Sequence, residues 1–431
     1  MKMLKLNKNT TQNILDTLLQ RSPNNYIQYE VVVDDILENV KRSGDLALTY
    51  YTNKFEGIEL QPVEFLVTEK EFETAYEKIS DGLLKIIRKS LANIQEYHQR
   101  QKQNSWFNST EDGTILGQKI TPLQRVGVYV PGGTAVYPSS VLMNIVPARV
   151  AGVPEIIMTT PCNNKGEVNP AVLVAAKEAG VTQIYKVGGA QAIGALAYGT
   201  KTIKKVDKIV GPGNMYVALA KKRIFGYSSI DSIAGPSEIL ILADKTANPT
   251  YIAADLLSQA EHDELASAIL VTTDKMFGHK VSLEVDRLTE KMERADIIKK
   301  SLNNFGCILI AETMDDAIDA VNEIASEHLE IQTADPFKTM TKIKNAGAIF
   351  LGSYSCESLG DYFAGPNHIL PTNGTAKFFS PLSVDDFVKK SSIIYYSEEA
   401  LKNVYEDVAQ FAHYEGLTAH ENAARIRFED K

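Results

Sequence analysis

The stretch QIYKVGGAQAIGALAY at residues 183–198 decides the fold class. Residues 183–187 read as a short strand, two glycines follow, and residues 190–198 are small and apolar, as in a buried helix. The same pattern of a strand followed by a helix recurs on both sides of this stretch. Strands are predicted at 126–130, 155–159 and 208–210, and helices at 139–151 and 170–179. Strands and helices that alternate at this spacing indicate parallel strands joined by right-handed crossovers. We therefore predict a Rossmann-like domain over residues 120–236.

A second series of the same kind follows. Its predicted strands are 238–242, 268–272, 307–310, 328–332 and 348–351, and its predicted helices are 249–260, 314–326 and 337–345. This series predicts a second Rossmann-like domain over residues 237–380, which meets the first near residues 232–236. Amphipathic spacing at 29–51 and 69–103 predicts a helical N-terminal region over residues 1–110, closed by a loop at 106–113. Residues 381–431 are expected to form a tail, helical from 398 to 427.

The composition is that of a globular cytoplasmic protein. Of 431 residues, 44% are hydrophobic and 23% are charged. The net charge of −9 disfavours nucleic acid or an anionic membrane as the main partner. No apolar run is long enough to span a bilayer, and the start of the chain does not look like a signal peptide. Three scattered cysteines predict no disulfide framework. We expect an enzyme with a small-molecule substrate.

Three predicted strand ends carry glycines, which read PGG at 131–133, GG at 188–189 and GPG at 211–213. Glycine at the carboxyl end of a parallel strand lets the backbone approach a phosphate, and the following helix N-terminus favours anions. None of the three is a complete dinucleotide fingerprint, and each alone is compatible with an ordinary tight turn. Together they favour a nucleotide or another anionic ligand. Tyr129, Gln191 and Asn214 could supply polar contacts to it.

A possible metal site lies in the stretch DLLSQAEHD at residues 255–263. Gln259 and His262 are three residues apart, so on a helix they project from one face. The pair could be half of a metal site or the polar end of an ordinary helix. A set of Gln259, His262, Asp361 and His420 offers two nitrogen and two oxygen ligands, which zinc accepts, although glutamine is an uncommon ligand.

Of the seven histidines, His98 and His279 are expected to be solvated surface residues, and the other five all lie in the second half of the chain. Glu327 and His328 fall where a predicted helix gives way to a strand. They could act as general acid and base, because imidazole titrates near neutral pH, or they could be a polar helix end. Asp361 and His368 share a loop rich in glycine and proline. Two further candidates, Glu415 and His420, lie in the tail.

Eight stretches together resemble the histidinol dehydrogenase family. They are residues 126–133, 188–194, 210–214, 234–238, 259–263, 326–330, 365–372 and 415–427, and they occur in the family's order over nearly the whole chain. The resemblance implies an NAD⁺-dependent, four-electron oxidation of L-histidinol to L-histidine through bound L-histidinal, the last step of histidine biosynthesis. It also implies one Zn²⁺ per subunit and a domain-swapped homodimer, in which the tail reaches the partner's active site.

The resemblance also assigns roles to individual residues. It implies that Glu327 and His328 are the catalytic acid/base pair. The implied zinc ligands are Gln259, His262, Asp361 and His420. The implied substrate contacts are these four ligands together with Ser237, His328, His368 and Glu415. The implied NAD contacts are Tyr129, Gln191 and Asn214.

Three alternatives remain open from the residues alone. Cys356 could form a thiohemiacetal with an aldehyde, although nothing near it in the sequence would lower a thiol pKa. Glu327 could instead serve a zinc-dependent hydrolase that uses no nucleotide. A binding protein without catalysis is the third alternative, but it would have no use for an acid/base pair.

Overall fold

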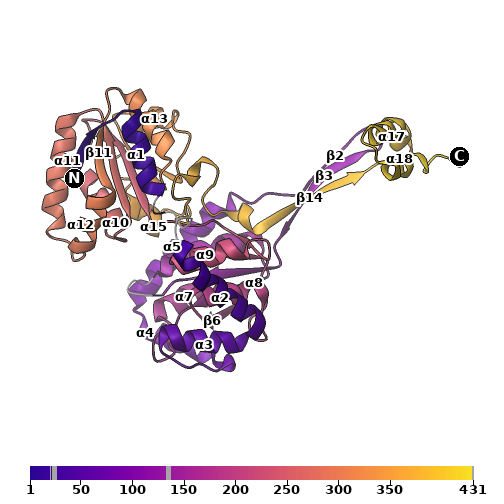
Figure 1. The fold of residues 1–431 in the computed structure, drawn as a ribbon, viewed down its shortest axis with the longest axis horizontal. Coiled ribbons are helices and arrows are strands. Elements are labelled where there is room, and N and C mark those ends of the chain that lie inside the picture. The colour runs from indigo at the N-terminus through magenta and orange to yellow at the C-terminus, as the bar shows by residue number, and fades with distance from the viewer. Residues whose placement is uncertain (20, 22–26, 133–136, 430–431) are drawn as a thin grey trace. The chain divides into compact units, whose positions relative to one another are not determined.

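The computed structural model describes residues 1–19, 21, 27–132 and 137–429, and it divides into two compact units (Figure 1). Unit 1 comprises Met1–Gln101 and Leu123–Phe387, and unit 2 comprises Lys102–Pro122 and Val388–Lys431. Within the described residues, no helix is both long and apolar enough to cross a bilayer. Each unit is described separately below.

The first sheet of unit 1 has five parallel strands in the order β6-β5-β4-β7-β8. They are β4 (Arg125–Tyr129), β5 (Glu155–Thr160), β6 (Gln183–Lys186), β7 (Lys208–Val210) and β8 (Ser229–Ile230). The helices between them are α6 (Pro138–Ala151), α7 (Pro170–Ala179), α8 (Gly189–Tyr198) and α9 (Met215–Ile224). The strands are almost entirely buried because helices cover both faces of a parallel sheet, which explains their continuous apolar runs.

The second sheet of unit 1 has six parallel strands in the order β1-β11-β10-β9-β12-β13. They are β1 (Lys2–Lys5), β9 (Glu238–Ala243), β10 (Ser267–Thr272), β11 (Gly306–Ile310), β12 (His328–Gln332) and β13 (Ala348–Leu351). In chain order, β9 to β13 repeat the arrangement of β4 to β8, with the third strand at one side and the first in the centre. This is the strand order of a Rossmann sheet. The prediction of two Rossmann-like parallel-sheet domains is confirmed.

Helices cover the second sheet on both faces, as Figure 1 shows. One face packs against α1 (Lys8–Leu19) and α13 (Met314–Ile324), with Leu240, Val271 and Leu309 in that core. The other face packs against α10 (Pro249–Ala260), α11 (Lys275–Thr289) and α12 (Ala295–Phe305). Alternate strand residues therefore enter different cores, as the two-residue period of a strand requires.

The N-terminal region differs from the helical region expected over residues 1–110. Strand β1 pairs in parallel with β11, and α1 contacts α13, so the first residues complete the second sheet. The helical expectation holds for α2 (Ile27–Ser43), α3 (Asp45–Glu56), α4 (Glu69–Lys78) and α5 (Asp81–Gln99). These four helices belong with the first sheet, because they contact α6 to α9. A four-residue edge strand with a distant partner carries little local signal, which is why helical spacing missed it.

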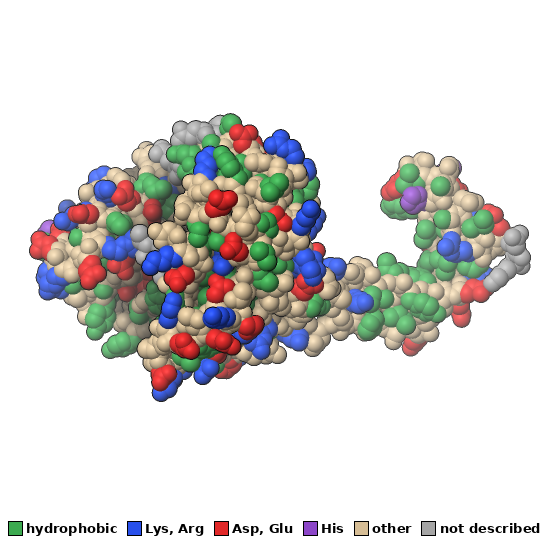
Figure 2. Space-filling model, turned by 90° about the horizontal axis from the view of Figure 1, so that it is seen from below, with side chains coloured by type: hydrophobic (Ala, Val, Ile, Leu, Met, Phe, Trp, Pro, Cys, Tyr) green, Lys and Arg blue, Asp and Glu red, His purple; other side chains and the backbone are tan. Residues whose placement is uncertain are grey.

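Unit 2 contains an antiparallel sheet in the order β14-β3-β2, with Val388 opposite Pro122 and Tyr395 opposite Ile115. Its strands are β2 (Trp106–Ser109), β3 (Ile115–Pro122) and β14 (Val388–Tyr395), so part of the loop expected at 106–113 is a strand. The expected helical tail is present as α16 (Glu398–Lys402), α17 (Tyr405–Tyr414) and α18 (Thr418–Arg425). Hydrophobic side chains gather on the surface of this unit (Figure 2). Phe107, Ile394, Phe411 and Tyr414 are between 64% and 83% exposed.

Candidate active site

Glu327 and His328 lie at the amino-terminal edge of the second sheet. Helix α13 ends at Ile324, and the next residue, Ala325, caps it with a left-handed φ of 53°, which turns the chain into β12. His328 is the first residue of β12 and pairs with Ile239 of β9 and Ala348 of β13. Both side chains are buried, with exposures of 7% and 4%.

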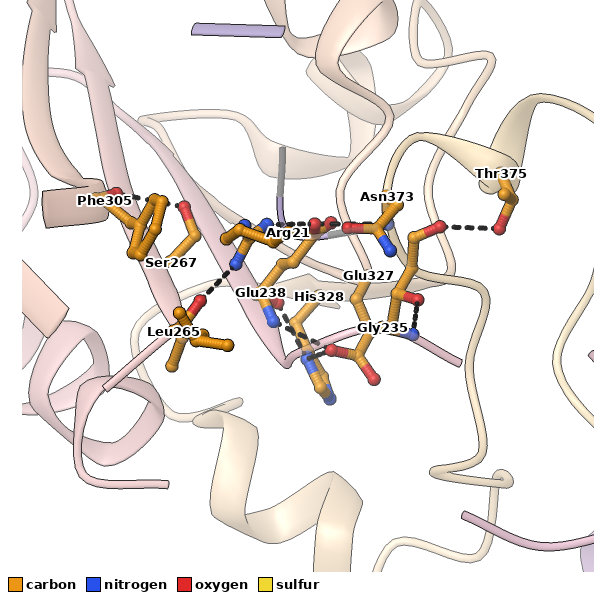
Figure 3. Close-up of polar contacts among 12 residues, drawn as sticks. Arg21, Gly235, Glu238, Leu265, Ser267, Phe305, Glu327, His328, Asn373 and Thr375 are labelled. Carbon is orange, nitrogen blue, oxygen red and sulfur yellow. Dashed lines mark hydrogen bonds and ion pairs between the residues drawn. The ribbon is translucent and has the colours of Figure 1, made fainter. Parts of the chain in front are cut away.

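The peptide of Glu238, at the start of β9, contacts both residues (Figure 3). Its N–H donates to Glu327 Oε2 at 2.8 Å, and its carbonyl oxygen accepts a hydrogen bond of 3.0 Å from His328 Nδ1. Because Nδ1 carries the proton, the neutral imidazole has its lone pair on Nε2. Nε2 is buried without a hydrogen-bond partner among the described residues and lies 3.8 Å from Asp361 Oδ1. This arrangement prepares Nε2 to accept a proton.

The electrostatic setting of the pair is unusual. Burial raises the pKa of the Glu327 carboxyl to about 8, although the His328 imidazole opposes this. Burial by itself would lower the pKa of His328, but the facing carboxyl groups of Glu327 and Asp361 raise it to about 10. A cation bound beside these groups would lower the pKa of His328 by repulsion and so favour the neutral imidazole.

A group of metal-binding side chains adjoins the pair. Ligand atoms of His262, Glu357 and Asp361 all lie within 4.8 Å of one another. Gln259, in the last turn of α10, is 1% exposed, and its Oε1 has no hydrogen-bond partner in the described structure. Burial acts to raise the pKa of Asp361, but the nearby imidazoles of His328, His368 and His262 hold it below its usual range. One nitrogen and two carboxylate oxygens, together with a buried unpaired amide oxygen three residues before His262, fit a divalent cation such as zinc.

A cavity of about 600 Å³ opens onto these residues, and His328, Asp361 and His368 are among those that line it. His368 Nδ1 donates to the Asp361 carbonyl oxygen at 2.9 Å, and its Nε2 lies 3.3 Å from Ser140 Oγ in α6. The 361–368 loop is thereby linked to the first helix that follows β4. A cavity of this volume suits a small ligand.

The expected nucleotide turns lie at the carboxyl edge of the first sheet. Tyr129 is buried, and its hydroxyl accepts a hydrogen bond of 3.1 Å from Gly189 N. Gln191 is 1% exposed, and its Oε1 is another buried acceptor without a partner in the described part of the chain. Asn214 is exposed and caps α9 by accepting from Val217 N. Gly133, in the first glycine turn, lies outside the described residues.

The sequence of this chain is similar to those of one known protein family. A family model described as "Histidinol dehydrogenase" matches residues 19–428. The chain belongs to the histidinol dehydrogenase family. A histidinol dehydrogenase of Geobacillus kaustophilus is 58% identical over 395 residues, which cover 92% of this chain and 93% of that protein. One of Bacillus subtilis is 57% identical over 395 residues, covering 92% of each.

A solved structure supports the same assignment. The crystal structure of histidinol dehydrogenase from Elizabethkingia anophelis superimposes with a TM-score of 0.94 at 36% identity, and it covers 100% of this chain and 98% of that one. This member of the histidinol dehydrogenase family is therefore an enzyme, an oxidoreductase of histidine biosynthesis.

The structure of this histidinol dehydrogenase family member brings some of the expected residues together. Gln259, His262, His328, Asp361 and His368 all belong to unit 1, and the last four are linked by the contacts given above. Ser237 immediately precedes Glu238, and its carbonyl oxygen accepts a hydrogen bond from Ser267 N. Their roles in the family's chemistry remain proposals.

Two expected site residues belong to unit 2. Glu415 caps the end of α17, and His420 lies in α18; both are exposed within that unit. The cluster of His262, Glu357 and Asp361 is formed by unit 1 without them.

Glu357 was not expected in the site. It is 1% exposed, its Oε2 accepts from Ser258 Oγ at 2.6 Å, and burial raises its pKa to about 7 against the charge of His328. It begins a six-residue helix, α15 (Glu357–Tyr362), and glutamates are common in first helical turns, so no sequence signal marks it. His98, expected at the surface, is fully buried, with Nδ1 donating to Ile94 O.

The geometry gives little support to Cys356 as a nucleophile. Its Sγ lies 3.4 Å from Ser358 Oγ, and it is not among the described residues that line the cavity. Cavity-lining neighbours include Ser355 and Leu359 instead.

Proposed function

We propose that this chain oxidises L-histidinol to L-histidine through bound L-histidinal, with two molecules of NAD⁺ as hydride acceptors. The observation that carries the proposal is the orientation of His328: Nδ1 is bonded to the Glu238 carbonyl oxygen, and the unpaired Nε2 belongs to a residue that lines the cavity. Family membership supplies the substrate class.

In the first half-reaction, His328 takes the hydroxyl proton while the carbinol carbon loses a hydride to NAD⁺, which leaves an aldehyde and NADH. In the second, Glu327 takes a proton from water as the water adds to the aldehyde, and His328 returns its proton to the aldehyde oxygen, which gives the hydrate. His328 then accepts a hydroxyl proton of the hydrate as the second hydride leaves, giving the carboxylic acid, which ionises to the carboxylate. The burial of the pair shields the aldehyde from side reactions.

Gln259, His262 and Asp361 would hold a Zn²⁺ ion, with His420 of a second subunit as the fourth ligand. When bound, zinc supplies a positive charge that can hold the imidazole and amine of the substrate. The unpaired Gln259 Oε1 and the depressed pKa of Asp361 support this assignment, because both fit a site built for a cation. The substrate contacts would then be Ser237, His328, His368 and Glu415 in addition to the ligands.

The NAD contacts would be Tyr129, Gln191 and Asn214, at the carboxyl edge of the first sheet. The unpaired Gln191 Oε1 supports this position of the cofactor, because a buried acceptor is normally bonded to a hydrogen-bond donor. The helix N-terminus that would usually bind a diphosphate is occupied, since Gly188 N donates to Glu56 Oε1 and Gly189 N to Tyr129 Oη. The cofactor would therefore bind without these two amides.

We also propose a cytoplasmic homodimer with exchanged tails. The exposed apolar side chains of unit 2 support this, because such a surface is costly to leave in water and is typical of an obligate interface. Exchange of residues 381–431 would let Glu415 and His420 serve the partner's site.

The test is the number of NADH formed per L-histidinol consumed, with and without a chelator. Two NADH per substrate, lost on chelation and restored by Zn²⁺, are expected. One NADH would indicate a simple alcohol dehydrogenase that releases its aldehyde. No NADH with metal present would favour the hydrolase or binding alternatives, and loss of activity in Cys356→Ala would favour a thiohemiacetal.

A further inference from the structure

Arg21 is a buried charge far from any expected site residue in the sequence. It is 2% exposed, yet it reaches Glu238, where Nη2 donates to Oε1 at 2.5 Å. Its Nη1 donates to the Leu265 carbonyl oxygen at 2.5 Å, and its guanidinium lies over the Phe305 ring, 5.1 Å from the centroid. The side chain is therefore fixed from several directions. Figure 3 shows it pointing toward Glu238.

Glu238 connects this ion pair to the catalytic candidates. Its side chain faces Arg21, and its peptide N–H and C=O contact Glu327 and His328 respectively. Glu238 is the first residue of β9, so the strand ladder fixes it on one side while a loop precedes it on the other. The ion pair anchors this residue at the point where the ladder ends.

The same carboxylate also holds the loops beside the site. Glu238 Oε1 accepts from Asn373 N at 3.1 Å, and Asn373 has a left-handed φ of 55°. Gly235 N donates to Thr372 Oγ1 at 2.7 Å. A Cβ on Gly235 would lie 1.9 Å from Asn373 Nδ2, so the two loops touch without room for a side chain. The loop that carries Ser237 is thus tied to the Glu238 carboxylate.

Stability alone does not explain such a pair. Desolvating two charges costs several kcal/mol, and well-packed apolar residues often replace a buried ion pair without loss of stability. What a charged hydrogen bond does provide is fixed geometry, because it holds a carboxylate in one orientation. Catalytic groups need positions fixed within a fraction of an ångström, which supporting residues provide.

We propose that Arg21 and Glu238 are positioning residues that orient Glu327 and His328 for proton transfer. This inference rests on the proposed function, in which Glu327 and His328 form the acid/base pair. Arg21 acts through Glu238 and has no role as a proton donor or acceptor. Its loss would shift the Glu238 peptide, and with it the direction in which His328 presents Nε2.

The experiment compares wild type with Arg21→Met and Arg21→Lys, both loaded with Zn²⁺. Arg21→Met is expected to lower kcat roughly 10- to 100-fold, because small displacements of reacting groups have effects of this size. KM for L-histidinol should stay within about 2-fold, since substrate binding is left in place. The pH at which kcat is half-maximal should change, because the Glu238 carbonyl oxygen that bonds to His328 Nδ1 shifts its position. Arg21→Lys retains the charge and should recover part of kcat.

Arg125→Met is the matched control. Like Arg21, Arg125 bonds to one carboxylate, that of Glu155, and to one backbone carbonyl oxygen, that of Lys205. It lies at the amino end of β4, at the opposite end of that strand from Tyr129. Its loss should lower the melting temperature and leave kcat and its pH profile unchanged. The proposal is overturned if folded Arg21→Met keeps kcat within about 2-fold of wild type. It is also overturned if Arg21→Met and Arg125→Met lower kcat by the same factor.

If Arg21→Met does not fold, the double variant Arg21→Met/Glu238→Gln takes its place. It removes both charges together and leaves an amide oxygen to accept from Asn373 N. The same limits on kcat and on the pH profile then decide whether the proposal is overturned. The wild-type NADH stoichiometry tests the proposed function separately, so two NADH per substrate with an unaffected Arg21 variant would reject only this inference.

Discussion

The imidazole of His328 is bonded at one nitrogen and unpaired at the other, and this asymmetry sets its chemistry. The Glu238 carbonyl oxygen fixes the proton on Nδ1, so Nε2 is the atom available to accept another. Sequence context could single out Glu327 and His328, because a Glu-His pair at a helix-to-strand junction is uncommon. It could not show that a peptide group of another strand orients both, since that contact spans about 90 residues.

Replacing His328 with Asn should lower kcat roughly 10²–10⁴-fold, the usual effect of losing a general base. Bound zinc should remain, because His328 is not one of the proposed ligands. Steady-state kinetics and metal analysis of the purified variant would show both. His279→Asn, which alters an exposed histidine in α11, serves as control and should retain full activity. Full activity in the His328 variant would contradict the proposed role.

The Gln259–His262 spacing could indicate one half of a metal site, although only Gln259 lies in α10, which ends at Ala260, and His262 lies in the turn that follows. Glu357 and Arg21 could not be foreseen. Each is an isolated charged residue whose burial depends on packing between segments far apart in the chain. Residue types identify chemistry only where several of them cluster in sequence.

At the scale of elements, alternating strands and helices could be predicted because their pattern is local. The same pattern indicates the edge of the sheet at which a residue lies. The glycine turns lie at the carboxyl edge of the first sheet, as parallel sheets favour. Glu327 and His328 instead lie at the amino edge of the second sheet, at the start of β12, as the predicted strand 328–332 implies. Strands β1 and β14 were missed because their pairing partners are distant in sequence. Strands β2 and β3 pair with each other locally and were missed because residues 106–113 have the composition of a loop.

Helix α10 and strand β12 share a pair of acids, the half-buried Asp255 and the buried Glu330, that predicts a pH effect. Burial raises the pKa of Asp255 to about 6, and burial together with the Asp255 charge raises that of Glu330 well above its usual value. The folded protein therefore holds protons that the unfolded chain releases above about pH 4. The stabilising contribution of these acids is complete at low pH and declines as pH rises through 6 and beyond.

Glu330→Gln removes one of these titrations and keeps a side chain that can donate to Asp255. In protein freed of metal by a chelator, its melting temperature relative to wild type should rise steadily from pH 5 to pH 8. Thermal unfolding at several pH values measures this difference. Glu290→Gln, which alters an exposed carboxylate at the end of α11, should show a constant difference. A constant difference for Glu330→Gln as well would mean that the pair does not hold an extra proton.

At the scale of the whole molecule, exchange of tails can be tested by mixing two inactive variants. His328→Asn damages a residue of unit 1, and His420→Asn damages one of unit 2. If the tail serves the partner, a mixed dimer contains one site with both changes and one site with neither. Unfolding and refolding an equal mixture should therefore restore about a quarter of wild-type activity. If the tail serves its own subunit, every site carries one change and the mixture stays inactive.

The pairing of β1 with β11 sets an order for folding during synthesis. Residues 2–5 leave the ribosome about 300 residues before their hydrogen-bonding partner at 306–310. Domains generally fold as their chain emerges, so the first sheet can close while this N-terminal segment is still unpaired. Strand β3 can pair early with the nearby β2, but its other edge has no partner until β14 has been made. A nascent chain of this protein therefore exposes first β1 and then one edge of β3, and these are the segments on which a chaperone would be expected to act.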